Sequence, residues 1–325
     1  MSSINIVPLP EKETERLKKL YRITFNDLNL RFIRTDPGNW VLPASYEKFK
    51  DRFAKWNLRQ DDIYILSFPK NGTTWTQELV WCVNNNADIQ TAKAVTMSER
   101  VPFLELPMVF NIMKDQLPSL KNDRLEFMEC MPSPRILETH LSLELLPHNL
   151  LDTCKVVSCL RNPKDTVVSF YHHEKLLNIH GYTGDFPSYF DLFMDNLVMF
   201  SPYFQYISEL WKLRNHPNMC LLFFEDMKKD LKASINKVAM FLGKELSEEQ
   251  VEKLETHLSF RKMKENPSVN KDGLKDMQLM DPSGSFFRKG EVGDWKNYFT
   301  ADMSKRMDAA IQRYLKPMGL EFSYE

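Results

Sequence analysis

Residues 61–81 read DDIYILSFPKNGTTWTQELVW, and this stretch decides the fold. Residues 63–66 form a short apolar run that favours a β-strand, and residues 69–72 (PKNG) interrupt it. From 73 to 81 the apolar residues have helical spacing and no proline intervenes. The sequence therefore predicts a strand, a tight loop and a helix. The unpaired N–H groups and the dipole at the start of such a helix bind a phosphate or sulfate.

The loop resembles the nucleotide P-loop, G-x-x-x-x-G-K-[ST], but departs from it at the lysine. Gly72 takes the second glycine position, whereas Ser67 stands at the first and Thr73 where the lysine is expected. The only lysine of the loop, Lys70, lies inside it and should reach a group closer in than a γ-phosphate. We interpret the loop as a site for a nucleotide with one 5′ phosphate and a transferable group. The alternative is a surface strand-to-helix turn that is rich in threonine by chance.

The composition is that of an ordinary globular enzyme, with 43% apolar and 27% charged residues among 325. A formal net charge of -1 gives no reason to expect a nucleic-acid or membrane surface, so any basic site must be local. The five cysteines show no CxxC spacing, which favours reduced thiols. The N-terminus has no apolar signal region, and no apolar run is long enough to cross a bilayer. We therefore expect a cytoplasmic protein.

Short apolar runs alternate with helical segments along the chain. Strands are predicted at 135–140, 155–160 and 219–224, and helices at 11–20, 164–177, 230–242, 247–257 and 300–315. This alternation predicts one α/β domain, 1–325, with a central, mostly parallel β-sheet flanked by helices. Residues 1–60 are interpreted as an N-terminal wrapping segment and 263–294 as a mobile loop that covers the cofactor or substrate. Residues 101–110, with two prolines, are either core-packing loop or a wall of an apolar acceptor pocket.

Three basic residues follow the predicted strands in turn. Lys70 follows the first strand, His140 closes the second and Arg161 follows the third. Because such folds bind ligands beyond the carboxyl ends of the strands, these side chains should meet at one edge of the sheet, beside the anion-binding loop.

Several longer segments add a family resemblance to this physical pattern. FPKNGTTW, RVPFLE, LRNPKDTVVSFYHH, FFEDMKKDL and the highly specific RKGEVGDWKNYFT lie in order between about residues 60 and 300. In these segments the chain resembles the cytosolic sulfotransferases, which use 3′-phosphoadenosine 5′-phosphosulfate (PAPS) as donor, and TQELVW is most similar to insect members. The resemblance implies transfer of a sulfuryl group to a hydroxyl or amine of a small, largely apolar acceptor. It also implies adenosine 3′,5′-bisphosphate (PAP) as the product and no metal.

The resemblance further implies roles for individual residues. His140 would be the general base and Lys70 would stabilise the leaving group. The cofactor would be bound by Lys70, Asn71, Gly72, Thr73, Thr74, Trp75, Arg161, Ser169, Phe224, Phe260, Phe286, Phe287, Arg288, Lys289 and Gly290. Within this set the arginines, Lys289, Gly290 and Ser169 would hold the 3′ phosphate, because guanidinium groups match a phosphate in bidentate geometry. A plain helix-entry cation at Arg161 and a solvated pair at Arg288 and Lys289 are the alternatives.

Glu138, Phe103 and His172 are candidates for contact with the acceptor, and packed helix residues are the alternative for His172 and His173. Glu138 departs from the family, which has K-T-H where this chain has E-T-H. Positions two apart in a strand share a face, so this carboxylate should lie beside His140 and raise the pKa of the histidine. Either activity is then reduced, or the carboxylate faces an acceptor that carries an amine.

Three other interpretations stay open at this point. A retinol-dehydratase-like member would sulfate an allylic alcohol and then eliminate, and a donor-binding protein would have weak catalysis because of Glu138. A P-loop nucleoside kinase is disfavoured by Thr73 and by the lack of an obvious Mg²⁺ carboxylate. The expected partner is a small-molecule acceptor, with no nucleic acid and no membrane. The family's dimer motif is altered, with Lys305 at its acidic end, so a homodimer of that kind is in doubt.

Overall fold

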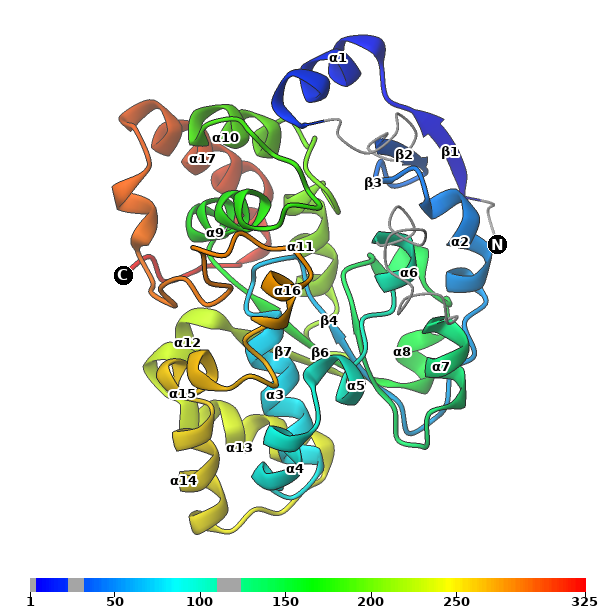
Figure 1. The fold of residues 1–325 in the computed structure, drawn as a ribbon, viewed down its shortest axis with the longest axis vertical. Helices are drawn as coiled ribbons and strands as arrows, with labels where there is room; N and C mark the ends of the chain where they lie inside the picture. Colours follow the sequence, from blue (N-terminus) through cyan, green and yellow to red (C-terminus); the bar gives the residue numbers. More distant parts are fainter. Residues whose placement is uncertain (1–3, 23–31, 110–123) are drawn as a thin grey trace.

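The structure of the protein is a computed structural model that describes residues 4–22, 32–109 and 124–325. A four-stranded sheet lies at its centre in the order β5–β4–β6–β7, and every neighbouring pair is parallel (Figure 1). Its strands are β4 (Ile63–Leu66), β5 (Ile136–Thr139), β6 (Lys155–Leu160) and β7 (Met219–Phe223). The prediction of an α/β fold with a parallel sheet is therefore confirmed, and all four predicted strands are present.

Helices cover both faces of this sheet because successive side chains of each strand point to opposite faces. Ile63 and Ile65 of β4 pack with α3 (Thr73–Asn84), α13 (Leu231–Leu242) and α14 (Glu248–His257). Tyr64 and Leu66 pack on the other face with α9 (Pro163–Leu176), α10 (Phe186–Met194), α11 (Tyr203–Lys212) and α17 (Ala301–Tyr314). The predicted helices agree with these bounds to within a few residues, and the capping box at Ser247 is formed.

A second sheet, which the sequence analysis missed, lies within the N-terminal 60 residues. Strands β1 (Asn5–Pro8), β2 (Phe32–Asp36) and β3 (Val41–Pro43) are antiparallel and accompany α1 (Glu11–Leu20) and α2 (Tyr46–Ala54). The predicted helix is confirmed as α1. The strands were missed because they are short and pair across segments that carry no alternating pattern. Their apolar side chains join the cluster on the Tyr64 face of the central sheet.

Short helices complete the described part of the chain. They are α4 (Ile89–Ala94), α5 (Met97–Arg100), α6 (Leu106–Val109), α7 (Arg124–Cys130), α8 (Leu150–Thr153), α12 (Phe224–Lys229), α15 (Phe260–Glu265) and α16 (Gly273–Asp276), with 3-10 turns at Leu143–Leu145, Asp294–Asn297 and Lys316–Met318. No helix within the described ranges meets the length and hydropathy that a membrane crossing requires.

The segment 263–294 crosses the carboxyl edge of the sheet and is hydrogen-bonded to the rest of the protein at several places. Ser268 accepts a hydrogen bond from the Met97 N–H at 2.8 Å, and its hydroxyl donates to the Ala92 carbonyl at 2.7 Å. Further along, the Asp281 N–H donates to the Leu176 carbonyl at the end of α9 at 2.9 Å. The segment thus bridges the two helical layers, and its mobility stays a prediction.

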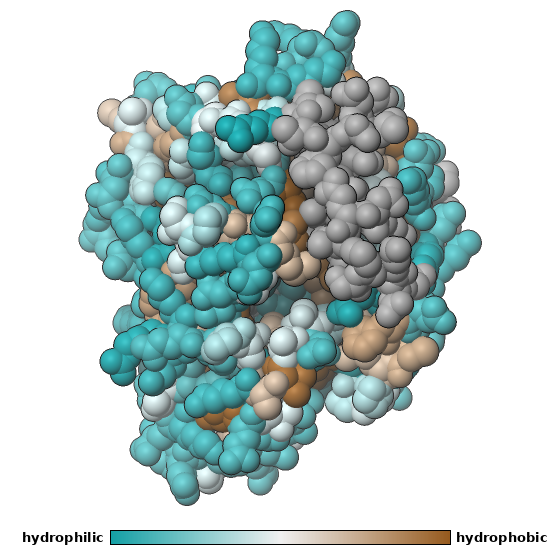
Figure 2. Space-filling view, in the orientation of Figure 1, coloured by the Kyte–Doolittle hydropathy of each residue, from teal (hydrophilic) through white to brown (hydrophobic). Residues whose placement is uncertain are grey.

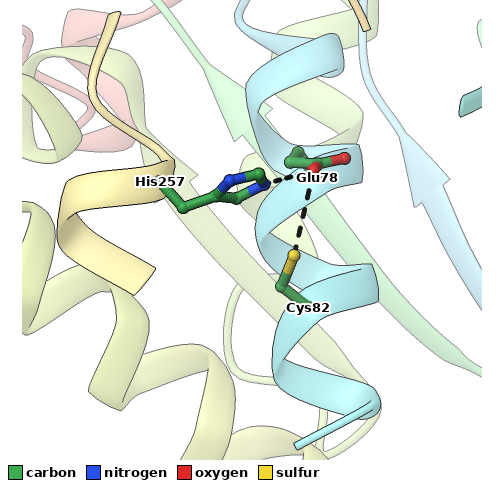
Figure 3. Close-up of side chains that lie close together, drawn as sticks. All are labelled: Glu78, Cys82 and His257. Atoms are coloured by element: carbon green, nitrogen blue, oxygen red, sulfur yellow. Dashed lines mark hydrogen bonds and ion pairs between the residues drawn. The ribbon is translucent and has the colours of Figure 1, made fainter. Parts of the chain in front are cut away.

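Helix α3, which begins at the anion-binding loop, is held by a buried carboxylate in its middle (Figure 3). One oxygen of Glu78 lies 2.6 Å from His257 Nε2, and the other accepts a hydrogen bond from Arg100 at 2.7 Å. Cys82, one turn further, approaches the same carboxylate at 3.9 Å. Glu78, Cys82 and His257 each offer an atom of a kind that binds metal ions. The contact between Glu78 and His257 is nevertheless a hydrogen-bond distance, and the second oxygen of Glu78 is engaged by Arg100. We therefore interpret Glu78, Arg100 and His257 as a buried triad that fixes α3 against α5 and α14.

Removing one partner of Glu78 should destabilise the fold strongly. We expect Arg100→Met to lower the free energy of unfolding by about 3–5 kcal/mol, because it leaves a buried carboxylate with less compensation. The matched control is Arg306→Met, which breaks an exposed ion pair with Asp191 and should cost no more than about 1 kcal/mol. Urea unfolding of the two variants measures both values, and equal losses would contradict the importance of the triad.

Candidate active site

A cavity of about 830 Å³ lies at the carboxyl edge of the parallel sheet. The face shown in Figure 2 is mostly hydrophilic, with hydrophobic side chains visible in a hollow near its middle. Eighteen of the predicted site residues line the cavity: Lys70, Gly72, Thr73, Thr74, Trp75, Phe103, Glu138, His140, Arg161, Ser169, His172, Phe224, Phe260, Phe286, Phe287, Arg288, Lys289 and Gly290. The predicted meeting of Lys70, His140 and Arg161 at one edge of the sheet is therefore confirmed.

Asn71 is the exception, because its side chain is fully buried away from the cavity. Its Oδ1 accepts a hydrogen bond from Thr166 Oγ1 on α9 at 2.8 Å, and its N–H donates to the Phe68 carbonyl at 3.3 Å. Both groups are engaged inside the protein, so the structure gives Asn71 the task of fastening the loop to α9. Its Nδ2 has no hydrogen-bond partner among the described residues, so the assignment of Asn71 as a cofactor contact stays a prediction.

The loop before α3 has the shape that an anion requires. Gly72 has φ of 106°, and a Cβ there would lie 3.1 Å from both Cys159 Sγ and Phe224 Cδ2, so only glycine fits without strain. No side chain caps α3, which leaves the N–H groups of its first turn for a ligand. Thr73 Oγ1 and Trp75 Nε1 are buried and have no hydrogen-bond partner among the described residues. These unpaired donors fit a phosphate and an adenine above the loop.

Lys70 carries an ammonium group that loses its proton more readily than that of an ordinary lysine. Its Nζ lies 4.2 Å from the centre of the Phe286 ring. Burial, followed by repulsion from Lys271, Arg161 and Arg288, lowers the pKa of Lys70 to about 7. An anion bound beside it would favour the charged form, so the site is prepared for negative charge.

The cations proposed for the 3′ phosphate lie on the same side of the molecule. Arg161 stacks 4.1 Å from the centre of the Phe224 ring and donates to the Glu291 carbonyl at 2.9 Å. Arg288 and Lys289 both pair with the buried carboxylate of Asp294. Both side chains are therefore oriented by an ion pair, although Lys289 remains exposed, and their binding of a 3′ phosphate stays a prediction. One carboxylate orients two cations and leaves part of their charge for a ligand.

His140 is held in the tautomer that a general base needs. Its Nδ1 lies 2.7 Å from the Ser67 carbonyl, which can only accept, so Nδ1 carries the proton. Nε2 makes no hydrogen bond within the described residues and can accept a proton. The ring lies between Phe103 and Phe200, whose centroids are 5.2 and 5.3 Å away. Burial makes the charged imidazolium unfavourable in this apolar setting.

Glu138 lies beside His140 as predicted, with its Oε1 3.6 Å from His140 Nε2. Gln77 donates a hydrogen bond to its second oxygen at 2.7 Å. Glu138 raises the pKa of His140, as expected, but it does not set the net direction of the shift. Burial has the larger effect and lowers the pKa of His140 below its usual 6.5.

The two histidines of α9 both line the cavity but have different surroundings. His172 Nε2 lies 2.8 Å from the Tyr298 hydroxyl, and burial, with repulsion from Arg288, lowers its pKa to about 4. It therefore lies on the Arg288 side of the cavity. His173 instead contacts the Phe286 ring, feels the charge of Lys70, and keeps a buried Nδ1 without a hydrogen-bond partner among the described residues.

Glu105 is a positioning residue that sequence reasoning missed, although it lies within the RVPFLE segment. Its carboxylate accepts hydrogen bonds from the Thr139 hydroxyl at 2.8 Å and from the N–H groups of His140 and Leu141 at 2.7 Å. Burial raises its pKa to about 8. These bonds fix the backbone that carries His140.

Residues 101–109 both pack in the core and line the cavity, the two roles that the sequence left open. Leu104 and Met108 are buried in the core, whereas Phe103, Leu106 and Val109 line the cavity. Phe110, the last residue of the predicted segment, lies outside the described residues. The cavity therefore has an apolar wall next to His140.

Comparisons with known proteins identify the family to which this site belongs. The family model described as "Sulfotransferase domain" matches residues 60–319. Sulfotransferase 1B1 of Canis lupus familiaris is 34% identical over 91% of this chain and 96% of its own, and sulfotransferase 1C2 of Homo sapiens is 34% identical over 89% and 94%. A crystal structure of retinol dehydratase with androsterone and the inactive cofactor PAP has a TM-score of 0.90 and 32% identity, covering 99% of each chain. Retinol dehydratase with retinol and PAP gives a TM-score of 0.88 and 30% identity, covering 98% of this chain and 99% of that chain.

These likenesses agree with the site geometry and remove the nucleoside kinase from consideration. Similarity to insect members in particular stays a prediction. The family match and the cation-lined cavity lead to one conclusion: the chain belongs to the sulfotransferase family and is a PAPS-dependent sulfotransferase.

Proposed function

We propose that a single domain binds PAPS along the carboxyl edge of the sheet and sulfates a small, largely apolar alcohol that enters beside His140. The observation that carries the proposal is that a free His140 Nε2, the Lys70 ammonium and the uncapped start of α3 share one cavity. Arg161, Ser169 and Arg288 line the part that would take the 3′ phosphate. We also propose a cytoplasmic location, supported by the five free cysteines.

The adenine is proposed to lie between the aromatic side chains near the start of α3. Trp75 and Phe224 are in edge contact, with ring centroids 5.6 Å apart, and Phe260 and Phe287 are 6.0 Å apart. Gly290 has φ of 65°, and a Cβ there would lie 2.2 Å from a Phe260 ring atom. The absence of that side chain keeps the backbone of the phosphate-binding segment close to the aromatic pair.

The residues of the cavity divide the chemical step between them. PAPS supplies an activated sulfuryl group on a phosphate leaving group. His140 Nε2 accepts the acceptor's hydroxyl proton while the new O–S bond forms. Lys70 and the N–H groups of α3 stabilise the electron pair left on the phosphate oxygen as the old S–O bond breaks. Because sulfuryl oxygens share a single negative charge, these donors can balance the charge that develops.

The apolar wall supports an apolar acceptor. Phe103, Leu106, Val109, Met199 and Phe200 line the cavity next to His140. Two solved structures of retinol dehydratase are complexes with retinol and with androsterone, both hydrophobic alcohols. The same likeness supports a second candidate, in which sulfation of an allylic alcohol is followed by elimination. Analysis of the product separates the two, because one reaction yields a sulfate ester and the other a dehydrated hydrocarbon.

Replacing the proposed base should remove turnover and spare donor binding. We expect His140→Ala to reduce transfer of labelled sulfate to an acceptor by roughly 10²–10⁴-fold, because no group remains to accept the hydroxyl proton. Thermal stabilisation by PAP should be retained. His148→Ala, at an exposed position, is the control and should behave as the unaltered protein. Wild-type turnover by His140→Ala across the pH range would refute the assignment.

The pH dependence should show both titrating groups. Activity requires neutral His140, so kcat/KM for the donor should fall on the acid side, below pH 6.5. It requires protonated Lys70, so kcat/KM should also fall as the pH rises above about 7. Lys70→Arg keeps its charge at high pH and should move this alkaline limb upward by several pH units. An alkaline limb that stays in place in Lys70→Arg would assign it to another group.

The 3′ phosphate should determine nucleotide affinity. We expect PAP to bind roughly ten-fold or more tightly than AMP, because charge-assisted hydrogen bonds to the 3′ group are lost with AMP. Arg288→Gln should weaken PAP while leaving AMP unchanged, as measured by isothermal titration calorimetry. Lys296→Gln, whose ammonium pairs with the exposed Glu325, is the control. Equal affinities of the native protein for PAP and AMP would contradict the proposed orientation.

A further inference from the structure

Lys271 brings a further cation into the cavity, and none of the motifs that carry the family resemblance includes it. Its Nζ lies 4.6 Å from the centre of the Phe286 ring, and the Nζ of Lys70 lies 4.2 Å from the same centre. One aromatic side chain therefore contacts two ammonium groups in the cavity that His140 and Glu138 also line. Within the described ranges no carboxylate forms an ion pair with Lys271.

The backbone fixes the point from which the Lys271 side chain extends. The three preceding residues, 268–270, are buried, and Ser268 is bonded to Met97 and Ala92. Lys271 itself has φ of 60°, a left-handed conformation that positions its carbonyl to accept the Leu274 N–H at 3.0 Å. These contacts hold the backbone from which the Lys271 side chain extends, so less backbone freedom is lost when that side chain contacts a ligand.

The charge of Lys271 acts on the groups that carry the reaction. It contributes to the lowered pKa of Lys70, His140 and His173 alike. Glu138 introduces a carboxylate where the family pattern has a lysine. Compared with that pattern, the cavity next to His140 therefore has one positive charge fewer and one negative charge more. Lys271 is the cation on the described chain that stands beside both Lys70 and His140 without a carboxylate partner of its own.

We propose that Lys271 binds the transferring sulfuryl group and replaces, from the segment 263–294, the lysine that Glu138 has displaced from β5. This inference rests on the proposed function. The ammonium would donate to sulfuryl oxygens as the S–O bond to the phosphate breaks and the acceptor O–S bond forms, while the proton still goes to His140. The contact is specific for PAPS, because PAP has no sulfuryl group.

Binding measurements test this contact without relying on turnover. Lys271→Met should weaken PAPS roughly ten-fold or more, the loss expected for a charge-assisted hydrogen bond, and leave PAP unchanged, as measured by calorimetry. Lys271→Arg should retain most of the PAPS affinity, since the charge remains. Lys275→Met is the matched control, because Lys275 belongs to the same segment and pairs with Asp272 outside the cavity.

A rescue experiment tests the exchange of positions. Lys271→Met should lower kcat by roughly ten-fold or more, and adding Glu138→Lys should recover much of the loss by returning a cation to the family's position. PAP-induced thermal stabilisation shows that each variant is folded. A double variant no better than Lys271→Met would overturn the replacement of one lysine by the other.

The outcomes separate this inference from the proposed function. If the unaltered protein transfers no sulfate to an apolar alcohol, the proposed function fails. If it transfers sulfate but Lys271→Met binds PAPS normally, the inference alone fails. An equal loss of PAP and PAPS, or a change confined to the acceptor KM, would also overturn it, because Lys271 would then contact the nucleotide or the acceptor.

Discussion

Mutual repulsion among the cations of the cavity is the constraint on which this site depends. Arg161 is buried and Lys70 is partly buried, and each has a depressed pKa because desolvation and neighbouring positive charges oppose its charged form. Contacts elsewhere in the fold hold the loop and its helix in place despite this repulsion. Asn71 fastens the loop to α9, and the hydrogen bonds of Glu78 to His257 and Arg100 fix α3. A ligand with several negative charges relieves the repulsion between these cations. Binding of the donor therefore stabilises the folded protein.

The sequence predicts those features of the site that depend on residues close together in the chain. The strand, loop and helix of 61–81 follow from a short apolar run, a break and a helical period, all within one window of sequence. The meeting of Lys70, His140 and Arg161 then followed from a general rule about parallel sheets. Each step needed only residue type and order, and each is confirmed.

The features that escaped prediction depend on contacts between distant segments. Glu105 supports His140 from 35 residues away, and the Ser67 carbonyl fixes the imidazole tautomer from 73 residues away. The pKa of His140 was expected to rise because the neighbouring carboxylate is visible in the sequence, whereas burial is not. Lys271 lies in a segment whose composition predicts only a loop, so its place beside Lys70 requires the fold.

The N-terminal sheet joins the acceptor side of the site through two backbone hydrogen bonds. The Val41 N–H donates to the Ser201 carbonyl and the Phe200 N–H donates to the Val41 carbonyl, both at 2.8 Å, and Phe200 packs against His140. In the proposed site, the nucleotide would be bound by residues that follow β4 and β6 and by the segment before α17. Donor recognition and acceptor choice would then have separate structural supports. Changes among the earliest strands would reshape which acceptors fit while leaving the sulfate-donating residues unaltered.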